Sequence, residues 1–154
     1  MFKRHGVLSE SEIRSRGELL LENYAKTVHI EALTALDMAR LEIFPSVVKY
    51  QDFLLSELEK KSKFQNLSSK PESELLLRIN KHFDDFYDQI NLLEKNLEKY
   101  PSSASASERA FFSKDTLLSN IEKLRKSADA IELLIGKQFM PYPSYEDILY
   151  SVKY

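Results

Sequence analysis

Residues that break helices are scarce in this sequence, and this scarcity constrains the fold more than any other feature. Its 154 residues include three Gly and five Pro. Three Ser-x-x-Glu sequences have the spacing of a capping box, in which each side chain accepts a hydrogen bond from the other residue's backbone N–H at a helix start. They are Ser9 with Glu12, Ser69 with Glu72, and Ser105 with Glu108. These signals predict helices over residues 10–44, 46–63, 72–100 and 106–135, and a short one over 145–151.

Apolar residues in the second half of the chain follow the period of packed helices. Two seams advance in steps of three and four, namely Leu76, Ile79, Phe83, Phe86, Ile90, Leu93, Leu97 and Tyr100, and then Leu117, Ile121, Leu124, Ala128, Ile131 and Ile135. Such steps are typical of helices that pack lengthwise. We therefore predict an all-α fold, an elongated antiparallel helical bundle that forms a single domain over residues 1–154. We expect this domain to be a fragment of a longer chain.

Three helix-breaking residues carry specific expectations. Pro45 lacks a backbone N–H, but the helical pattern continues on both sides of it, so we predict a kink in a long first helix and not a stop. Gly17 lies inside that helix, where glycine costs about 1 kcal/mol relative to Ala, and this indicates close packing. Gly136 is expected to end the last long helix as its C′ residue.

The charge balance and the lack of cysteine exclude several classes of protein. The 22 Lys and Arg residues oppose 24 Asp and Glu, a net charge of −2, which argues against a nucleic-acid partner because such binding depends on many contacts to phosphates. With no Cys, disulfide scaffolds, thiolate zinc sites and Cys nucleophiles are excluded. No long uncharged apolar run and no signal-peptide pattern is present, so we expect no membrane partner and a cytoplasmic location.

Motifs for catalysis, cofactors and metals are not found. The three His residues lie on different segments without metal-ligand spacing. The three Gly residues are too far apart to form a phosphate-binding loop, and no Ser lies in a Gly-x-Ser-x-Gly elbow. We therefore predict no catalytic, cofactor-binding or metal-binding residue in this chain.

Two groups of residues are candidates for structural or interface roles. Thr34, Asp37 and Arg40 form a polar row within an apolar stretch, and Asp37 and Arg40 are placed to form an ion pair. The C-terminal tail is stiffened by two prolines and rich in aromatic side chains, so we expect it to lie in a groove, either on this bundle or on a neighbouring molecule. The candidate contact residues of this tail are Phe139, Pro141, Tyr142, Pro143 and Tyr145.

Two stretches of the sequence resemble a known family, the type III glutamine synthetases. The first resembles the region just after the catalytic domain of that family, and the second resembles its C-terminal ending. The residues of the first are Phe2-Lys-Arg-His-Gly-Val-Leu-Ser-Glu10, Ser15-Arg16, Glu18, Leu21-Glu22, Tyr24, Lys26, Ile30-Glu-Ala-Leu-Thr34, Asp37-Met-Ala39 and Pro45. The residues of the second are Leu124-Arg125, Ala128-Asp129, Glu132-Leu133, Pro141-Tyr-Pro-Ser-Tyr145 and Asp147-Ile-Leu149.

The resemblance implies that the chain is the C-terminal helical domain of a longer enzyme, which makes glutamine from glutamate, ammonia and ATP with Mg or Mn. The metal, nucleotide and glutamate sites of that family lie upstream of the part resembled, so no active-site residue is implied here. A non-catalytic domain of this kind is expected to pack on the catalytic domain and to support a homo-oligomer. Glu31, Asp37 and Arg40 are then candidates for polar residues that fix the register of the first helix.

Two other interpretations stay open. In the first, the chain is a free-standing helical adaptor that binds a protein partner, such as a glutamine synthetase in trans. In the second, it is an independent small enzyme, for which the apolar seams offer the one possible pocket and no acid–base pair is evident.

Overall fold

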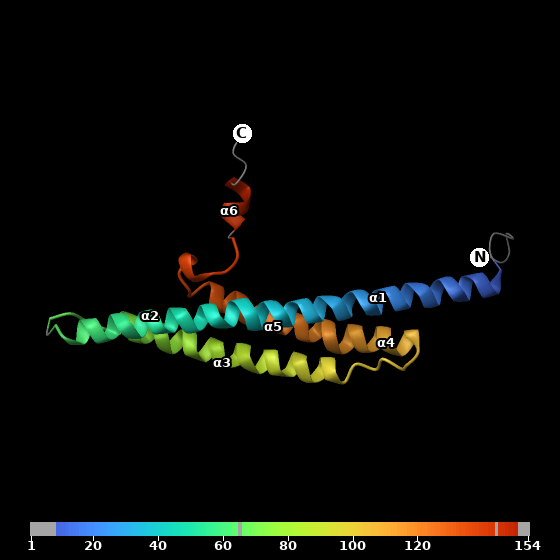
Figure 1. Cartoon of the computed structure of the whole chain (residues 1–154), viewed down its shortest axis with the longest axis horizontal. Helices are drawn as coiled ribbons and strands as arrows, with labels where there is room; N and C mark the ends of the chain where they lie inside the picture. The colour runs from blue at the N-terminus through green and yellow to red at the C-terminus, as the bar shows by residue number, and fades with distance from the viewer. Residues whose placement is uncertain (1–8, 65, 144, 151–154) are drawn as a thin grey trace. The chain divides into compact units, whose positions relative to one another are not determined.

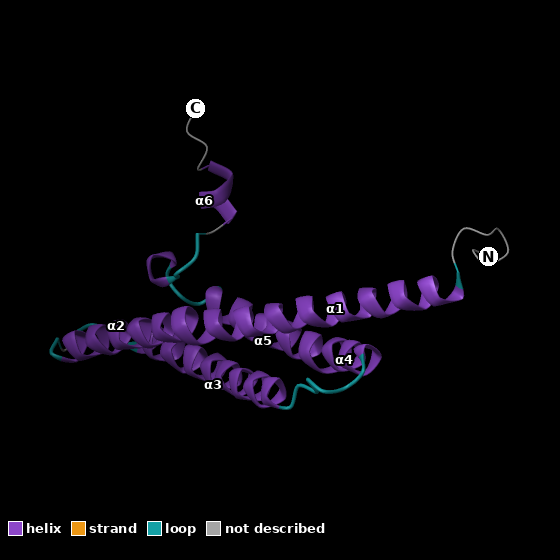
Figure 2. Cartoon of the chain, turned by 45° about the vertical axis from the view of Figure 1, so that its right-hand side comes forward, coloured by secondary structure: helices purple, strands orange, loops and turns teal. Residues whose placement is uncertain are grey.

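In the computed structural model, which describes residues 9–64, 66–143 and 145–150, every regular element is a helix (Figures 1 and 2). No strand occurs in these described residues. The α-helices are α1 (Glu10–Met38), α2 (Phe44–Ser62), α3 (Lys70–Glu98), α4 (Ala106–Phe112), α5 (Ser119–Glu132) and α6 (Tyr145–Tyr150). Two π-helical turns, η2 (Ala39–Ile43) and η3 (Ser113–Leu118), and a 3₁₀ turn, η4 (Lys137–Phe139), complete the set. The all-α prediction is therefore confirmed, as is the long first helix.

The chain divides into two compact units, which we describe separately. The first unit comprises the chain up to residue 35 together with Leu92–Glu122. The second comprises Leu36–Asn91 and the chain from Lys123 onward. The prediction of a single domain over residues 1–154 stays a prediction.

Two of the capping boxes expected from the sequence are present. At the start of α1, the Ser9 backbone N–H donates to Glu12 Oε2 at 2.7 Å, and the Glu12 N–H donates to Ser9 Oγ at 3.2 Å. At the start of α4, Ser105 and Glu108 exchange the same two hydrogen bonds at 2.9 and 3.2 Å. The boxes satisfy backbone donors that would otherwise have no partner at a helix start.

Buried positions recur every seven residues along the helices. On α3 they include Ile79, Phe86 and Leu93, and on α4, η3 and α5 they include Ala110, Leu117, Leu124 and Ile131. On α1, η2 and α2 the corresponding series is Ala25, Ala32, Ala39, Val47 and Leu54, in which one interval is eight residues. In a regular α-helix, an interval of eight residues instead of seven would turn the later buried residues away from the side on which the earlier ones lie. A local widening of the helix would compensate for the additional residue.

The π-helical turn η2 absorbs that additional residue. The Phe44 N–H bonds to the Ala39 carbonyl, five residues back, instead of the four of an α-helix. The turn lies directly before Pro45, which has no N–H to donate, and helical structure continues into α2. Pro45 therefore does not stop the helix, and the kink at this position stays a prediction.

Two expectations about glycine are wrong. A Cβ added at Gly17 would have no neighbour within 4 Å, so close packing does not explain that glycine. Helix α5 ends at Glu132, and Gly136 has φ −60° and ψ 135°, which is extended backbone and not the left-handed C′ conformation. The helix therefore ends before the glycine, which instead precedes the η4 turn.

Candidate functional site

The candidate polar residues of the first helix lie on the surface. Glu31 and Asp37 of α1 and Arg40 of η2 are all exposed. An ion pair between Asp37 and Arg40 would be screened by water and would contribute about 0–1 kcal/mol. A role of these three residues in fixing helix register stays a prediction.

Part of the C-terminal tail packs against α2 of the same chain. The ring of Phe139 lies 4.9 Å from that of Tyr50 and 5.4 Å from that of Phe53, measured between centroids. Tyr50 and Phe53 are themselves 6.2 Å apart and nearly parallel. These distances are typical of aromatic pairs, which stabilise a contact beyond the area that they bury. We call Phe139, Tyr50 and Phe53 the aromatic clip.

A second contact of the tail involves Tyr142 and η2. The Tyr142 hydroxyl is buried and makes no hydrogen bond of ordinary geometry within the described part of the chain. The pKa of Tyr142 is raised to about 12, chiefly by burial. The Glu42 carboxylate adds to the shift, first because the protonated phenol is placed to donate toward it and then because its negative charge disfavours a second one. The neutral phenol is therefore the form that this position favours.

The two prolines of the tail are more exposed than Phe139 and Tyr142. Pro141 and Pro143 are exposed, while Tyr145 begins α6 and its side chain lies outside the described part of the structure. A salt bridge of 2.8 Å between Lys137 Nζ and Asp147 Oδ1 joins η4 to α6. Beyond it, three consecutive apolar residues of α6 are exposed, namely Ile148, Leu149 and Tyr150.

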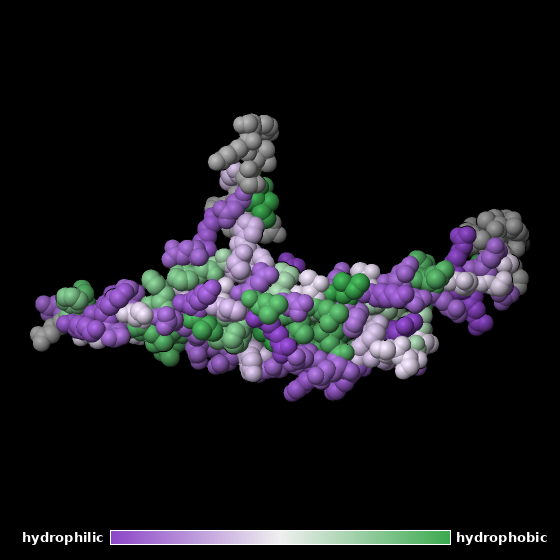
Figure 3. All heavy atoms as spheres, viewed as in Figure 1, coloured by the Kyte–Doolittle hydropathy of each residue, from purple (hydrophilic) through white to green (hydrophobic). Residues whose placement is uncertain are grey.

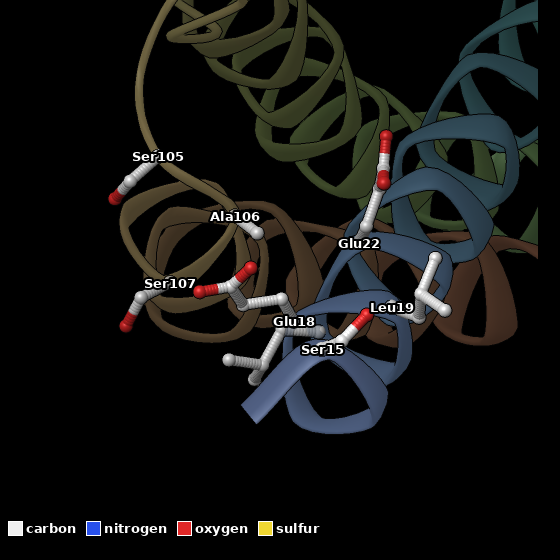
Figure 4. A pocket seen from close by; sticks show the side chains of 8 residues that line it. Ser15, Glu18, Leu19, Glu22, Ser105, Ala106 and Ser107 are labelled. Carbon is white, nitrogen blue, oxygen red and sulfur yellow. The ribbon is translucent and has the colours of Figure 1, made fainter. Parts of the chain in front are cut away.

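A shallow pocket lies on the first unit between α1 and the start of α4 (Figure 4). It is lined by Ser15, Glu18, Leu19, Leu21 and Glu22 of α1, and by Ser105, Ala106 and Ser107. Glu22 forms salt bridges with Lys26 at 3.0 Å and with Arg109 at 3.8 Å. The hydrogen bond and charge of Lys26, together with the charge of Arg109, hold the pKa of Glu22 below its usual range. The pair Glu22 and Lys26 has i, i+4 spacing, a signal that the sequence offered and our sequence analysis missed.

Polar side chains are also enclosed in the first unit. Ser113 is fully buried and Asn120 is 6% exposed, and Ser113 Oγ and Asn120 Nδ2 have no hydrogen-bond partner among the described residues. The ring of His29 lies 4.2 Å from that of Tyr100, which lies 6.0 Å from that of Phe112. Ser113 and Asn120 lie in the same three- and four-residue steps as the buried Ala110, Leu117 and Leu124. They were not identified from the sequence, because the seam was followed through apolar residues alone.

The described residues hold no group of three or more His, Asp or Glu side chains that could bind a metal ion. No helix in the same part is both long enough and apolar enough to cross a membrane.

Large apolar side chains are exposed on several helices, and Figure 3 shows hydrophobic groups on the visible surface among hydrophilic ones. They include Leu20, Ile30 and Leu33 of α1, Leu77 of α3, Phe111 of α4 and Leu133 beyond α5. Scattered apolar residues are normal on a protein surface, whereas contiguous ones mark interaction sites. On α1, Ile30 and Leu33 are three residues apart and therefore lie on one side of the helix.

Comparison with known proteins gives consistent matches. Residues 1–62 match the sequence model of the glutamine synthetase C-terminal domain. A glutamine synthetase of Butyrivibrio fibrisolvens is 34% identical over 154 residues, which cover 99% of this chain and 22% of the relative. A glutamine synthetase of Bacteroides fragilis is 26% identical, covering 94% of this chain and 21% of the relative. The type-3 glutamine synthetase of Dictyostelium discoideum is 24% identical, covering 97% and 21%.

The chain thus spans about a fifth of the length of the curated relatives it matches. No solved structure matches it. The resemblance found in the sequence is confirmed by these matches: the chain is similar along its length to glutamine synthetases, including a type-3 enzyme, and its residues 1–62 match the C-terminal domain of that family.

Proposed function

We propose that the chain is a non-catalytic domain of a type III glutamine synthetase, where it packs on the catalytic domain and supports assembly of the oligomer. The observation that carries this proposal is similarity along 99% of the chain to an enzyme of which it spans 22%. Its contribution is burial of surface, since a standard interface buries about 800 Å² on each partner.

Exposed apolar side chains support this role. Leu20, Ile30 and Leu33 on α1, and Leu149 and Tyr150 on α6, expose large apolar groups. The aromatic clip holds the preceding part of the tail on α2, so that α6 begins from an anchored segment. Anchoring before binding lowers the entropy cost of association.

The parent reaction, ligation of ammonia to glutamate with ATP, is assigned to the catalytic domain. ATP and Mg or Mn would be bound there, and the protein is proposed to be cytoplasmic.

The test is association in solution. The 154-residue chain is mixed with a separately produced catalytic portion of a type III synthetase, and binding is followed by calorimetry and sedimentation. We expect a stable complex, and no glutamine formation by the chain alone when glutamate, ammonia, ATP and Mg²⁺ are supplied. If the chain forms glutamine alone, or fails to bind the catalytic portion, the proposal is wrong.

The free-standing adaptor receives no support from the comparisons but makes a different prediction. An antibody against this domain should detect, on a denaturing gel of native lysate, a band several-fold heavier than 17.9 kDa if the domain belongs to a synthetase. A band at 17.9 kDa would favour the adaptor.

A further inference from the structure

One face of α1 carries a short pattern of charged and apolar side chains. Lys26, Ile30, Leu33 and Asp37 follow one another at i, i+4, i+7 and i+11 on one continuous helix. At about 100° per residue, these four positions fall within about 60° of the helix circumference. All four are exposed, with Ile30 at 61% and Leu33 at 44%. The stripe is distinct from the buried seam of Ala25, Val28 and Ala32.

The order of side chains along this face makes it complementary to itself. Read from the N-terminus, the order is positive, apolar, apolar, negative. Read in the opposite direction, it is negative, apolar, apolar, positive. An antiparallel second copy would therefore place each Lys26 opposite Asp37 and each Ile30 opposite Leu33. A parallel copy would instead place Lys26 opposite Lys26 and Asp37 opposite Asp37, which is repulsive.

We propose that this face of α1 pairs antiparallel with the same face of a second copy of the chain. The proposal rests on the proposed function, because it names the partner and the surface through which the domain supports assembly. Ile30 and Leu33 supply the apolar centre, and the charged pairs at both ends set the orientation. Exposed charges of this kind determine specificity and register more than affinity.

The test uses charge reversal in the 154-residue chain. Sedimentation equilibrium of the unchanged chain should show a monomer–dimer equilibrium. Lys26→Glu places a new carboxylate opposite Asp37 of the second copy, and Asp37→Lys places a new ammonium group opposite Lys26. Each variant should therefore self-associate at least about tenfold more weakly. By two-fold symmetry, each substitution alters two contacts per dimer.

Mixing the two variants gives the sharpest outcome. In a mixed pair, the two substituted side chains face each other with opposite charges, and Asp37 of the Lys26→Glu variant faces Lys26 of the Asp37→Lys variant. Each variant alone should be mainly monomeric, whereas the mixture should form a heterodimer at the concentration where the unchanged chain dimerises. This result does not depend on the salt bridge between Glu22 and Lys26, which Lys26→Glu removes within each chain.

Glu31→Lys is the matched control. Glu31 is exposed on α1 but lies about 100° from Ile30 around the helix, outside the face. This variant should dimerise like the unchanged chain, and circular dichroism should show equal helix content for all variants. The inference is overturned if the unchanged chain is monomeric at its highest soluble concentration, if Glu31→Lys weakens dimerisation as much as Asp37→Lys, or if the mixture stays monomeric. A chain that binds the catalytic portion yet does not pair in this way overturns this inference and leaves the proposed function standing.

Discussion

The buried hydroxyl of Tyr142 lies beside the carboxylate of Glu42, so that a residue of the C-terminal tail meets the π-helical turn that precedes Pro45. Earlier in the same tail, Phe139 contacts Tyr50 and Phe53 in the aromatic clip. Phe139 and Tyr142 of the tail thus both lie against residues of their own chain, and packing of the tail on a neighbouring molecule stays a prediction.

The first prediction concerns alkaline pH. At neutral pH, Tyr142 is protonated in both the folded and the unfolded chain. Above pH about 10 the unfolded phenol loses its proton, whereas the folded phenol keeps it up to about 12. The unfolded state then binds fewer protons, so the free energy of unfolding should fall as the pH rises from about 10 to about 12.

Tyr142→Phe isolates this effect from the other tyrosines. Its free energy of unfolding should fall less steeply over the same pH range, measured by urea denaturation. At pH 7 the substitution should change stability by less than about 1 kcal/mol, because the hydroxyl that it removes has no hydrogen bond of ordinary geometry. Equal slopes for both proteins would show that Tyr142 is not protected from ionisation.

The second prediction tests the aromatic clip. Phe139 is half-buried and contacts two rings, so Phe139→Ala should lower the free energy of unfolding by about 2 kcal/mol and expose the tail to proteases. The control is Phe111→Ala, because Phe111 is 62% exposed and should change stability by less than about 0.5 kcal/mol. Similar losses for both would contradict a specific role for the clip.

The starts of α1 and α4 were predicted from the sequence because a capping box depends on only two residues, three positions apart. Ser9 with Glu12 and Ser105 with Glu108 form the hydrogen bonds that their spacing requires. Glu72, which was expected to cap α3 with Ser69, instead accepts a hydrogen bond from Lys61 of α2. Lys61 is eleven residues from Glu72 in the sequence, and the loop between α2 and α3 brings the two side chains together. Rules that consider only residues three or four apart do not predict such a contact.

Features that depend on neighbours in space were not predicted. The π-helical turn at Ala39–Ile43 follows from the eight-residue interval between Ala39 and Val47, but this interval is evident only when the buried positions are known. The environment of Gly17 is likewise decided by neighbours that the sequence does not identify. The exposed face of α1 was missed because Ile30 and Leu33 are apolar, and sequence alone does not distinguish an exposed apolar residue from a buried one.

The third prediction uses the open space at Gly17. Gly17→Ala should raise the free energy of unfolding by about 0.5–1 kcal/mol, because Ala favours helix and its Cβ meets no atom within 4 Å. Gly136→Ala is the comparison. It would contact Phe139 and Tyr50 at ordinary distances of 3.6 and 3.9 Å and lies outside the α-helices, so it should gain less. Destabilisation by Gly17→Ala would show that something packs on this position.

The fourth prediction concerns acidic pH. Hydrogen bonds from the Ser105 hydroxyl and backbone hold the pKa of Glu108 below 4.5. A lowered pKa means that the unfolded state takes up protons first, so this contribution to stability should be lost as the pH falls below about 4.5. Glu108→Gln keeps a capping side chain that does not titrate and should flatten the acid limb of the stability curve. An unchanged acid limb would contradict the role of this carboxylate.

The last prediction compares two buried serines near the two π-helical turns. Ser46 is 8% exposed and its hydroxyl donates to the Glu42 carbonyl at 2.8 Å, whereas Ser113 is fully buried and its hydroxyl has no partner in the described part of the chain. Ser46→Ala should therefore lower the free energy of unfolding by about 1 kcal/mol. Ser113→Ala removes an unsatisfied hydroxyl and should leave stability unchanged or raise it by about 1 kcal/mol. Urea denaturation distinguishes the two, and destabilisation by Ser113→Ala as large as that by Ser46→Ala would show that Ser113 has a hydrogen-bond partner, such as a buried water.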